Sequence, residues 1–260
     1  MVELTKKELL ARNRICLALD NIKSTEAAFD LAYELSDYVG MFKIGKELHI
    51  IAGNEGTDII SIGIISKRPG SVFLDLKLHD TPNTVFQASL NSVRPEVYMF
   101  NVHLSGGEAM CRKAMEGAEK GFDNLEKEVK KGLARPKVIG VTMLTSLNDN
   151  DLETLGFKSN YSDQVLKMAE LAVKWGLDGI VCPAKEAGKM EKRFGSSLLY
   201  VTPGIEWGGV AGAGQKQLYD PVQAIKDCNN SILVIGSAIT KAPNSAQTAY
   251  EIVQAMAKHI

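Results

Sequence analysis

The chain has 260 residues, of which 45% are hydrophobic and 23% are charged, and its formal net charge is −1. This length favours one large α/β domain with a substantial core over two compact domains, and the near-neutral charge gives no bulk attraction to nucleic acid or to anionic membranes. We therefore expect a single domain spanning residues 1–260, with neither nucleic acid nor membrane among its partners.

The cysteine pattern and the start of the chain indicate a cytoplasmic protein. No C-x-x-C pair occurs among Cys16, Cys111, Cys182 and Cys228, which predicts reduced core thiols in place of disulfides or a zinc site. No segment approaches the roughly 18 uninterrupted apolar residues of a membrane-spanning helix. Residues 1–14 carry too many charges for a signal peptide.

Short apolar runs alternate with longer amphipathic segments from one end of the chain to the other. The runs predict strands at residues 15–20, 39–45, 71–77, 97–103, 137–143, 178–182, 198–202 and 232–236. The amphipathic segments predict helices at residues 24–37, 57–67, 82–93, 106–120, 162–175, 183–193, 221–227 and 244–258. Eight strand–helix pairs predict a closed (β/α)8 TIM barrel. The alternative is an open doubly wound sheet, although no G-x-G-x-x-G motif follows the first strand.

Two segments interrupt this alternation. Residues 121–135 are rich in lysine and glutamate, and we expect them to form a solvated helical extension before the fifth strand. Residues 202–219 form a loop longer than a usual βα connection, with glycines at Gly204, Gly208, Gly209, Gly212 and Gly214. Long glycine-bearing loops in compact folds are often lids or ligand clamps, so we expect this loop to lie at a ligand site.

The stretch FLDLKLHDTPNT at residues 73–84 alternates apolar and charged side chains. As a strand it points Leu74, Leu76 and Leu78 to one face and Asp75, Lys77 and His79 to the other. A solvent-facing polar side explains such a pattern in an antiparallel edge strand. In a barrel both faces are covered, and charges there are costly unless they are paired or kept for chemistry. Because the carboxylates of Asp75 and Asp80 favour its ammonium form, Lys77 is predicted to be a proton donor.

Chemistry in such a barrel belongs at the C-terminal ends of the strands. Five ionisable residues of alternating sign are predicted there, namely Asp20, Lys43, Asp75, Lys77 and Asp80. We interpret them as a catalytic cluster, with a structural salt-bridge network as the alternative. Loops seven and eight of these barrels often hold phosphate through backbone amides, which makes the 202–219 loop and the pair Gly236 and Ser237 candidates for that role. The histidines His79 and His103 lack metal-ligand spacing, so no metal site is predicted.

Five motifs stand out when the strand ends are compared with known families. They are FLDLKLHDTPNT at 73–84, VTMLTS at 141–146, VTPGI at 201–205, ALD at 18–20 and FKIG at 42–45. Together, and in this order along the chain, they resemble the orotidine 5'-monophosphate decarboxylase family. The resemblance implies a homodimeric barrel that removes CO2 from orotidine 5'-monophosphate to give UMP, the last step of pyrimidine nucleotide synthesis, without a metal or an organic cofactor.

The resemblance also implies a role for each candidate residue. Lys77 would protonate C6 of the pyrimidine while Asp75 sits beside the departing carboxylate, and Asp80 would reach in from the partner subunit. The implied substrate-binding residues are Asp20 and Lys43 at the ribose, Thr145 and Ser146 at the base, Pro203 as an apolar wall, Gln215 between base and phosphate, Gly236 and Ser237 at the phosphate, and Thr81 and Thr84 of the longest motif. Physical reasoning agrees, because a carbanion forming at a ring carbon needs fixed positive charge and a proton donor nearby.

Three positions depart from the family's pattern. Ser237 stands where the family usually carries an arginine that grips the phosphate, Glu206 where it usually carries another arginine, and Thr81 where it usually carries isoleucine. A bidentate arginine is worth about 1.5–3 kcal/mol to a phosphate. We therefore expect weaker phosphate binding, by backbone amides and the Ser237 hydroxyl, with Lys216 or Lys241 nearby. The departure affects substrate affinity and leaves the catalytic cluster intact.

Two other functions remain as alternatives. A Mg2+-dependent sugar-phosphate decarboxylase or synthase of the same barrel group shares an Asp-x-Lys-x-x-Asp motif, but the Pro-Asn-Thr and Leu-Thr-Ser segments argue against it. The second alternative is a regulatory nucleotide-binding barrel whose catalysis was weakened along with the missing arginine. Such a protein would have no reason to keep all of the proton-handling residues.

Overall fold

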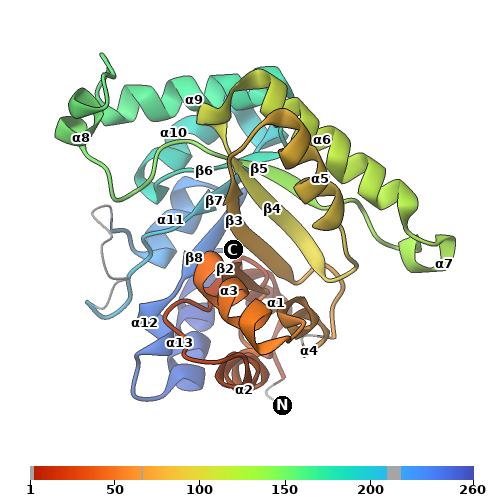
Figure 1. Cartoon of the computed structure of the whole chain (residues 1–260). Coiled ribbons are helices and arrows are strands. Elements are labelled where there is room, and N and C mark those ends of the chain that lie inside the picture. The colour runs from red at the N-terminus through yellow and green to blue at the C-terminus, as the bar shows by residue number, and fades with distance from the viewer. Residues whose placement is uncertain (1–2, 66, 210–217) are drawn as a thin grey trace.

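The computed structural model describes residues 3–65, 67–209 and 218–260, and within these ranges the chain forms a closed barrel of eight parallel strands. The strands follow one another around the barrel in sequence order, and β8 pairs with β1 to close it. Helices connect the strands and surround the barrel (Figure 1). The prediction of a (β/α)8 TIM barrel is confirmed.

Each strand lies within a few residues of its predicted position. The strands are β1 Ile15–Ala18, β2 Met41–Gly45, β3 Val72–Leu78, β4 Val97–His103, β5 Lys137–Val141, β6 Gly179–Val181, β7 Leu199–Thr202 and β8 Ser231–Ile235. A strand that is covered on both faces reads as a nearly continuous apolar run, and β1, β2, β7 and β8 are buried at every position. That continuity is why the strands are visible in the sequence.

The longer helices cover the outside of the barrel. They are α2 Thr25–Leu35, α3 Lys46–Glu55, α5 Pro82–Asn91, α6 Gly107–Asn124, α9 Tyr161–Trp175, α10 Ala184–Phe194 and α13 Ser245–Ala257. The shorter elements are α1 Lys6–Arg12, η1 Ile59–Ser61, α4 Ile62–Ile65, η2 Leu104–Gly106, α7 Lys127–Lys130, α8 Asp149–Thr154, η3 Gly195–Ser197, α11 Pro221–Asp227 and α12 Ser237–Thr240. No helix in the described ranges is long and apolar enough to cross a membrane.

Several predicted helices have clear chemical starts. The side chains of Ser24, Asn160 and Asn244 accept hydrogen bonds from backbone N–H groups in the first turns of α2, α9 and α13. Proline occupies the first turn of α5 and of α11, where its missing N–H costs nothing. These signals explain why the pattern located the helices correctly.

The pattern failed where such signals are weak. Helix α3 was not predicted, because it follows β2 directly and its N-cap, Gly45, makes no side-chain hydrogen bond. The helix predicted over residues 57–67 differs in extent in its described part, which leaves out residue 66: η1 and α4 form there, from Ile59 to Ile65. The extension predicted over 121–135 is reduced to the end of α6 at Asn124 and the single turn of α7.

The core has two layers, separated by the strands. The inner layer fills the barrel and includes Cys16, Phe73, Met99, Ile139, Val201 and Val234. The outer layer lies between strands and helices and includes Leu17, Leu74 and Phe100. Neighbouring residues of one strand belong to different layers, as Phe73 and Leu74 do. This alternation, continued along β3, directs Asp75 and Lys77 toward the barrel axis. The four cysteines are buried free thiols, as predicted.

Candidate active site

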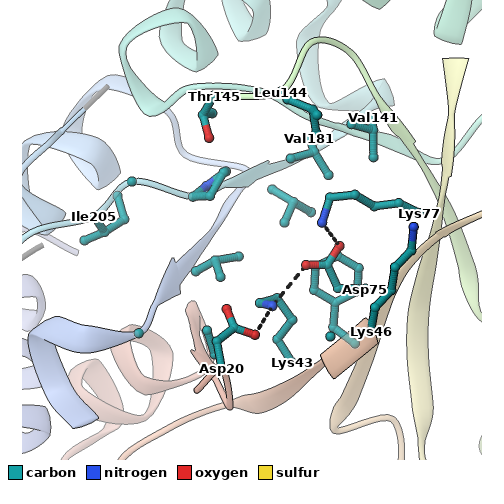
Figure 2. A pocket seen from close by; sticks show the side chains of 18 of the residues that line it. Asp20, Lys43, Lys46, Asp75, Lys77, Val141, Leu144, Thr145, Val181 and Ile205 are labelled. Atoms are coloured by element: carbon teal, nitrogen blue, oxygen red, sulfur yellow. Dashed lines mark hydrogen bonds and ion pairs between the residues drawn. The ribbon is translucent and has the colours of Figure 1, made fainter. Parts of the chain in front are cut away.

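Four charged side chains form a row across the C-terminal ends of the first three strands (Figure 2). The Lys43 Nζ atom lies 2.8 Å from Oδ1 of Asp20 and 3.0 Å from Oδ2 of Asp75. The Lys77 Nζ atom lies 2.6 Å from Oδ1 of Asp75. Acid and base therefore alternate along the row, and Asp75 is held between two ammonium groups.

The two central members of the row are almost fully removed from water. The Lys43 side chain is 7% exposed and the Asp75 side chain 11%, against 44% for Asp20. Burial alone would raise the pKa of Asp75, but the charges of Lys43 and Lys77 outweigh it and hold this pKa below its usual value. Burial alone would lower the pKa of Lys43, and the two carboxylates reverse this effect and raise it. Asp75 and Lys43 are therefore both ionised at neutral pH.

The backbone of β3 is irregular where it presents Lys77. Leu74 pairs with Phe100 and Leu78 with Val102, so three residues of β3 face one residue of β4. Lys77 has a φ of 50°, a left-handed conformation that costs a residue with a side chain about 1–3 kcal/mol. The Asn101 side chain, which is 0% exposed, sits in the bulge and bonds to both Lys77 and Asp75.

The row borders a cavity of about 320 Å3, which is within the size range of small-molecule sites. Much of the remaining lining is apolar, and Figure 2 shows Val141 and Val181 close to the Lys77 side chain and Ile205 farther from the charges. The cavity thus offers charge and hydrogen bonds along the row and apolar surface beside it. An aromatic ring with one polar edge matches this division.

The cavity brings together most of the predicted site residues. Its lining includes Asp20, Lys43, Asp75, Lys77, Thr145, Pro203, Gly236 and Ser237. Gln215 and Lys216 lie outside the described residues. Ser146 and Lys241 are not part of the lining.

The second half of the longest motif lies elsewhere. Asp80, Thr81 and Thr84 are exposed and do not line the cavity of their own chain. The Asp80 carboxylate accepts a hydrogen bond from the Thr81 backbone N–H at 2.6 Å. The side chain of His79, expected beside Lys77, packs near His103 instead, with ring centroids 5.3 Å apart. Burial and the charges of neighbouring groups lower the pKa of His103 to about 4, so this ring is neutral at pH 7.

Sequence reasoning missed several residues of the site. Asn101 was one of them, and its only signal was a polar amide within the apolar strand 97–103. Lys46 also lines the cavity, from the first turn of the unpredicted helix α3. Phe73 and Val234 form part of its apolar surface. Nothing in the spacing of these residues distinguishes them from ordinary core or surface positions.

Barrels of this kind carry their chemistry at the C-terminal ends of the strands, and the charged cavity found there marks the chain as a (β/α)8-barrel enzyme. A family model described as "Orotidine 5'-phosphate decarboxylase / HUMPS family" matches residues 13–252. The chain belongs to this family, as its motifs indicated.

Individual relatives match over nearly their whole length. The orotidine 5'-phosphate decarboxylase of Geotalea daltonii is 40% identical over 245 residues, which cover 94% of this chain and 95% of that protein. The protein of the same name from Erythrobacter litoralis is 39% identical over 243 residues, covering 92% and 97%. A crystal structure of orotidine 5'-phosphate decarboxylase from Lactobacillus acidophilus superposes with a TM-score of 0.77 at 28% identity, covering 93% of this chain and 98% of that one.

Proposed function

We propose that the chain decarboxylates orotidine 5'-phosphate to UMP in pyrimidine nucleotide synthesis, with Lys77 as the proton donor and without a metal or organic cofactor. Family membership and the names of its relatives support this activity. The observation that carries the proposal is the charge row from Asp20 to Lys77, with Lys43 and Asp75 buried at its centre, beside a cavity that also has apolar lining. It offers a fixed ammonium where a ring carbon would develop negative charge.

The reaction breaks the bond between C6 of the pyrimidine and its carboxylate carbon. The electron pair of that bond stays on C6, and the CO2 leaves uncharged. In our proposal the Lys77 ammonium first stabilises this negative charge and then donates a proton to C6, after which solvent returns a proton to the amine. Asp75 lies within 2.6 Å of the Lys77 Nζ atom, so it aims the ammonium and places a negative charge near the departing carboxylate.

The remaining lining residues suit the other parts of the nucleotide. We assign Asp20 and Lys43 to the ribose hydroxyls, and Thr145 to the base. Pro203 would supply part of the apolar wall against the ring. Ser146, Thr84 and Gln215 remain proposed substrate contacts, although the first two lie outside the cavity lining and the third outside the described residues.

The phosphate is assigned to the turn that follows β8. Gly236 and Ser237 line the cavity, where Gly236 is the N-cap of α12 and Ser237 its first residue. The N–H groups of Ile239 and Thr240 already donate to the Gly236 carbonyl, so the proposed phosphate donors are the backbone N–H groups of Gly236 and Ser237 and the Ser237 hydroxyl. Gly204, two residues after the end of β7, lines the same cavity. Without the family's usual arginine, these groups are uncharged, so binding of the phosphate at this point relies on neutral hydrogen bonds.

We further propose that the protein acts in the cytoplasm as a homodimer. Asp80 and Thr81 are exposed next to the end of β3, and in the dimer each would complete the charge row of the partner subunit. The exposure of two polar residues directly after the catalytic strand supports this assignment. A monomer with full activity would contradict it.

A magnesium-dependent sugar-phosphate enzyme fits the site less well. The Lys43 ammonium occupies the space between Asp20 and Asp75, where two carboxylates would otherwise be available to a divalent cation. In the described parts of the chain, no group of three or more His, Cys, Asp or Glu side chains is arranged to hold a metal ion.

The test is the loss of orotidine 5'-phosphate absorbance when purified protein is added, with and without a chelator. We expect turnover by the wild type under both conditions, and a large loss of turnover in Lys77→Ala with UMP binding retained. Turnover that disappears with the chelator would favour the magnesium enzyme. UMP binding without any turnover by the wild type would contradict the proposal and favour a regulatory nucleotide-binding barrel.

A further inference from the structure

The irregular pairing between β3 and β4 leaves the backbone N–H of Lys77, on β3, without a backbone acceptor on β4. Asp75, Leu76 and Lys77 lie between two paired positions of β3, while the matching stretch of β4 contains Asn101 alone. A parallel strand normally satisfies its backbone N–H groups from the neighbouring strand. Where three residues face one, this pattern breaks, and a buried N–H without a partner is costly.

The Asn101 side chain replaces the missing backbone partner. Its Oδ1 atom accepts a hydrogen bond from the Lys77 backbone N–H at 2.7 Å. Its Nδ2 atom donates to Oδ1 of Asp75, also at 2.7 Å. The orientation of the amide follows from its partners, because an N–H requires an acceptor and an ionised carboxylate requires a donor. The amide of Asn offers the acceptor and the donor on two separate atoms of one short side chain.

These two bonds fix the two groups that define the proton donor. The first holds the backbone of Lys77 in its left-handed conformation, with φ of 50°. The second holds the same oxygen of Asp75 that bonds to the Lys77 Nζ atom at 2.6 Å. A single buried amide therefore sets where the lysine stem leaves the strand and where its ammonium is anchored.

We propose that Asn101 is a positioning residue for the reaction, which keeps the Lys77 ammonium aimed at the substrate carbon without touching the substrate itself. The inference rests on the proposed function, since it assigns Lys77 the role of proton donor. It predicts that loss of the amide lowers kcat while leaving nucleotide binding largely unchanged, because the ribose and phosphate contacts lie on other strands.

The first test replaces the amide with an apolar side chain of similar size. Asn101→Leu removes both hydrogen bonds, and a misplacement of about 1 Å is expected to lower kcat by about 100-fold. KM and the affinity for UMP should stay within about threefold of the wild type, since uniform binding is not affected. The control is Met99→Leu, a change at the preceding inward-facing position of β4, which is equally buried. It should keep nearly full kcat.

The second test separates positioning from general packing. Asn101→Asp keeps the shape and the acceptor for Lys77 but sets a second carboxylate against Asp75. The other titratable groups around this pair are Lys43, Lys77, Asp20, Cys16 and His103. Two adjacent carboxylates share a proton as the pH falls, and this proton restores the missing donor. The kcat of Asn101→Asp should therefore be low at neutral pH and recover toward acid, whereas wild-type kcat should not rise.

The outcomes distinguish this inference from the proposed function. A wild type without activity on orotidine 5'-phosphate defeats the proposed function. A wild type with activity, together with near-normal kcat in Asn101→Leu, overturns the positioning role. If Asn101→Leu does not fold, the pH profile of Asn101→Asp decides, and a flat profile parallel to the wild type overturns the inference. A crystal structure of folded Asn101→Leu should show Lys77 outside the left-handed region, because the acceptor for its backbone N–H is gone, and an unchanged φ in that variant would also overturn the inference.

Discussion

The Lys43 ammonium offers the sharpest test of the charge row, because it bridges Asp20 and Asp75 from a buried position. Lys43→Met keeps most of the apolar stem and removes only the charge. The change leaves Asp75, with its side chain 11% exposed, next to one ammonium in place of two. The carboxylate of Asp20 is 44% exposed and can be solvated, so the cost falls mainly on Asp75.

Removing one partner of a buried ion pair typically costs 3–5 kcal/mol. Asp75 keeps its bonds to Lys77 and Asn101, so we expect the lower end, about 3 kcal/mol. For a protein of this size that corresponds to a fall in Tm of about 6–12 °C at pH 7. The same substitution at Lys46, an exposed lysine lining the same cavity, should change stability by less than about 0.5 kcal/mol.

The pH dependence of this loss follows from Asp75. In the wild type, burial alone would raise the pKa of Asp75, but the charge of Lys43, followed by that of Lys77, holds this pKa below its usual value. Its contribution to stability is therefore present above the unfolded-state pKa and is lost as the pH falls through the folded-state pKa. In Lys43→Met the folded-state pKa of Asp75 rises, so the loss of stability relative to the wild type is largest at neutral pH. It should shrink as the pH approaches about 4, where an ordinary aspartate titrates.

The assay is thermal unfolding of the wild type, Lys43→Met and the double variant Lys43→Met/Asp75→Asn between pH 7 and about pH 4. The double variant Lys43→Met/Asp75→Asn removes the orphaned charge and should recover most of the lost stability at pH 7. A single variant with wild-type Tm would refute the reasoning that the pair is buried and coupled. A double variant no more stable than the single one would show that lost packing, and not an unpaired carboxylate, causes the destabilisation.

Three further predictions concern the reaction. Lys77→Ala should lower kcat by about 10²–10⁴-fold with UMP affinity retained, and near-normal kcat in a steady-state assay would refute the assigned donor. Ser237→Arg should raise kcat/KM about 10- to 150-fold if a charge-assisted phosphate contact of 1.5–3 kcal/mol is restored. The control Lys241→Arg, which adds no charge, should leave kcat/KM nearly unchanged. No gain in Ser237→Arg would mean that the charge on the phosphate is neutralised by another residue. Gly45→Ala would place a Cβ 3.0 Å from Oδ1 of Asp20, so KM should rise several-fold at nearly constant kcat, and an unchanged KM would argue against a ribose contact at Asp20.

The fold was predictable because its signals are local. Each strand is a short apolar run, and most long helices begin at a capping side chain or a proline. The charge row was also predictable in outline, because consecutive parallel strands bring their C-terminal ends together. Asp20, Lys43 and Asp75 each end or follow such a run, so the barrel topology alone placed them side by side.

The parts that escaped prediction depend on non-local geometry. The bulge in β3 arises from its pairing with β4, and the role of Asn101 appears only when the two strands are set in register. Helix α3, and with it the place of Lys46 on the cavity, had no capping signal. Asp80 belongs to the same motif as Lys77, yet the turn after β3 carries it away from the cavity of its own chain. The spacing of residues in the sequence does not show where the chain turns after β3.

The most direct test of the central claim follows hydrogen exchange at C6 of UMP bound to the enzyme in D2O. If the Lys77 ammonium delivers a proton to C6 in the forward reaction, the neutral amine must remove that proton in reverse. Wild-type protein should therefore exchange the C6 hydrogen of UMP for deuterium, detectable as loss of its proton NMR signal, and Lys77→Ala should not. Equal exchange rates for wild type and Lys77→Ala, at saturating UMP, would contradict the assignment of Lys77 as the proton donor.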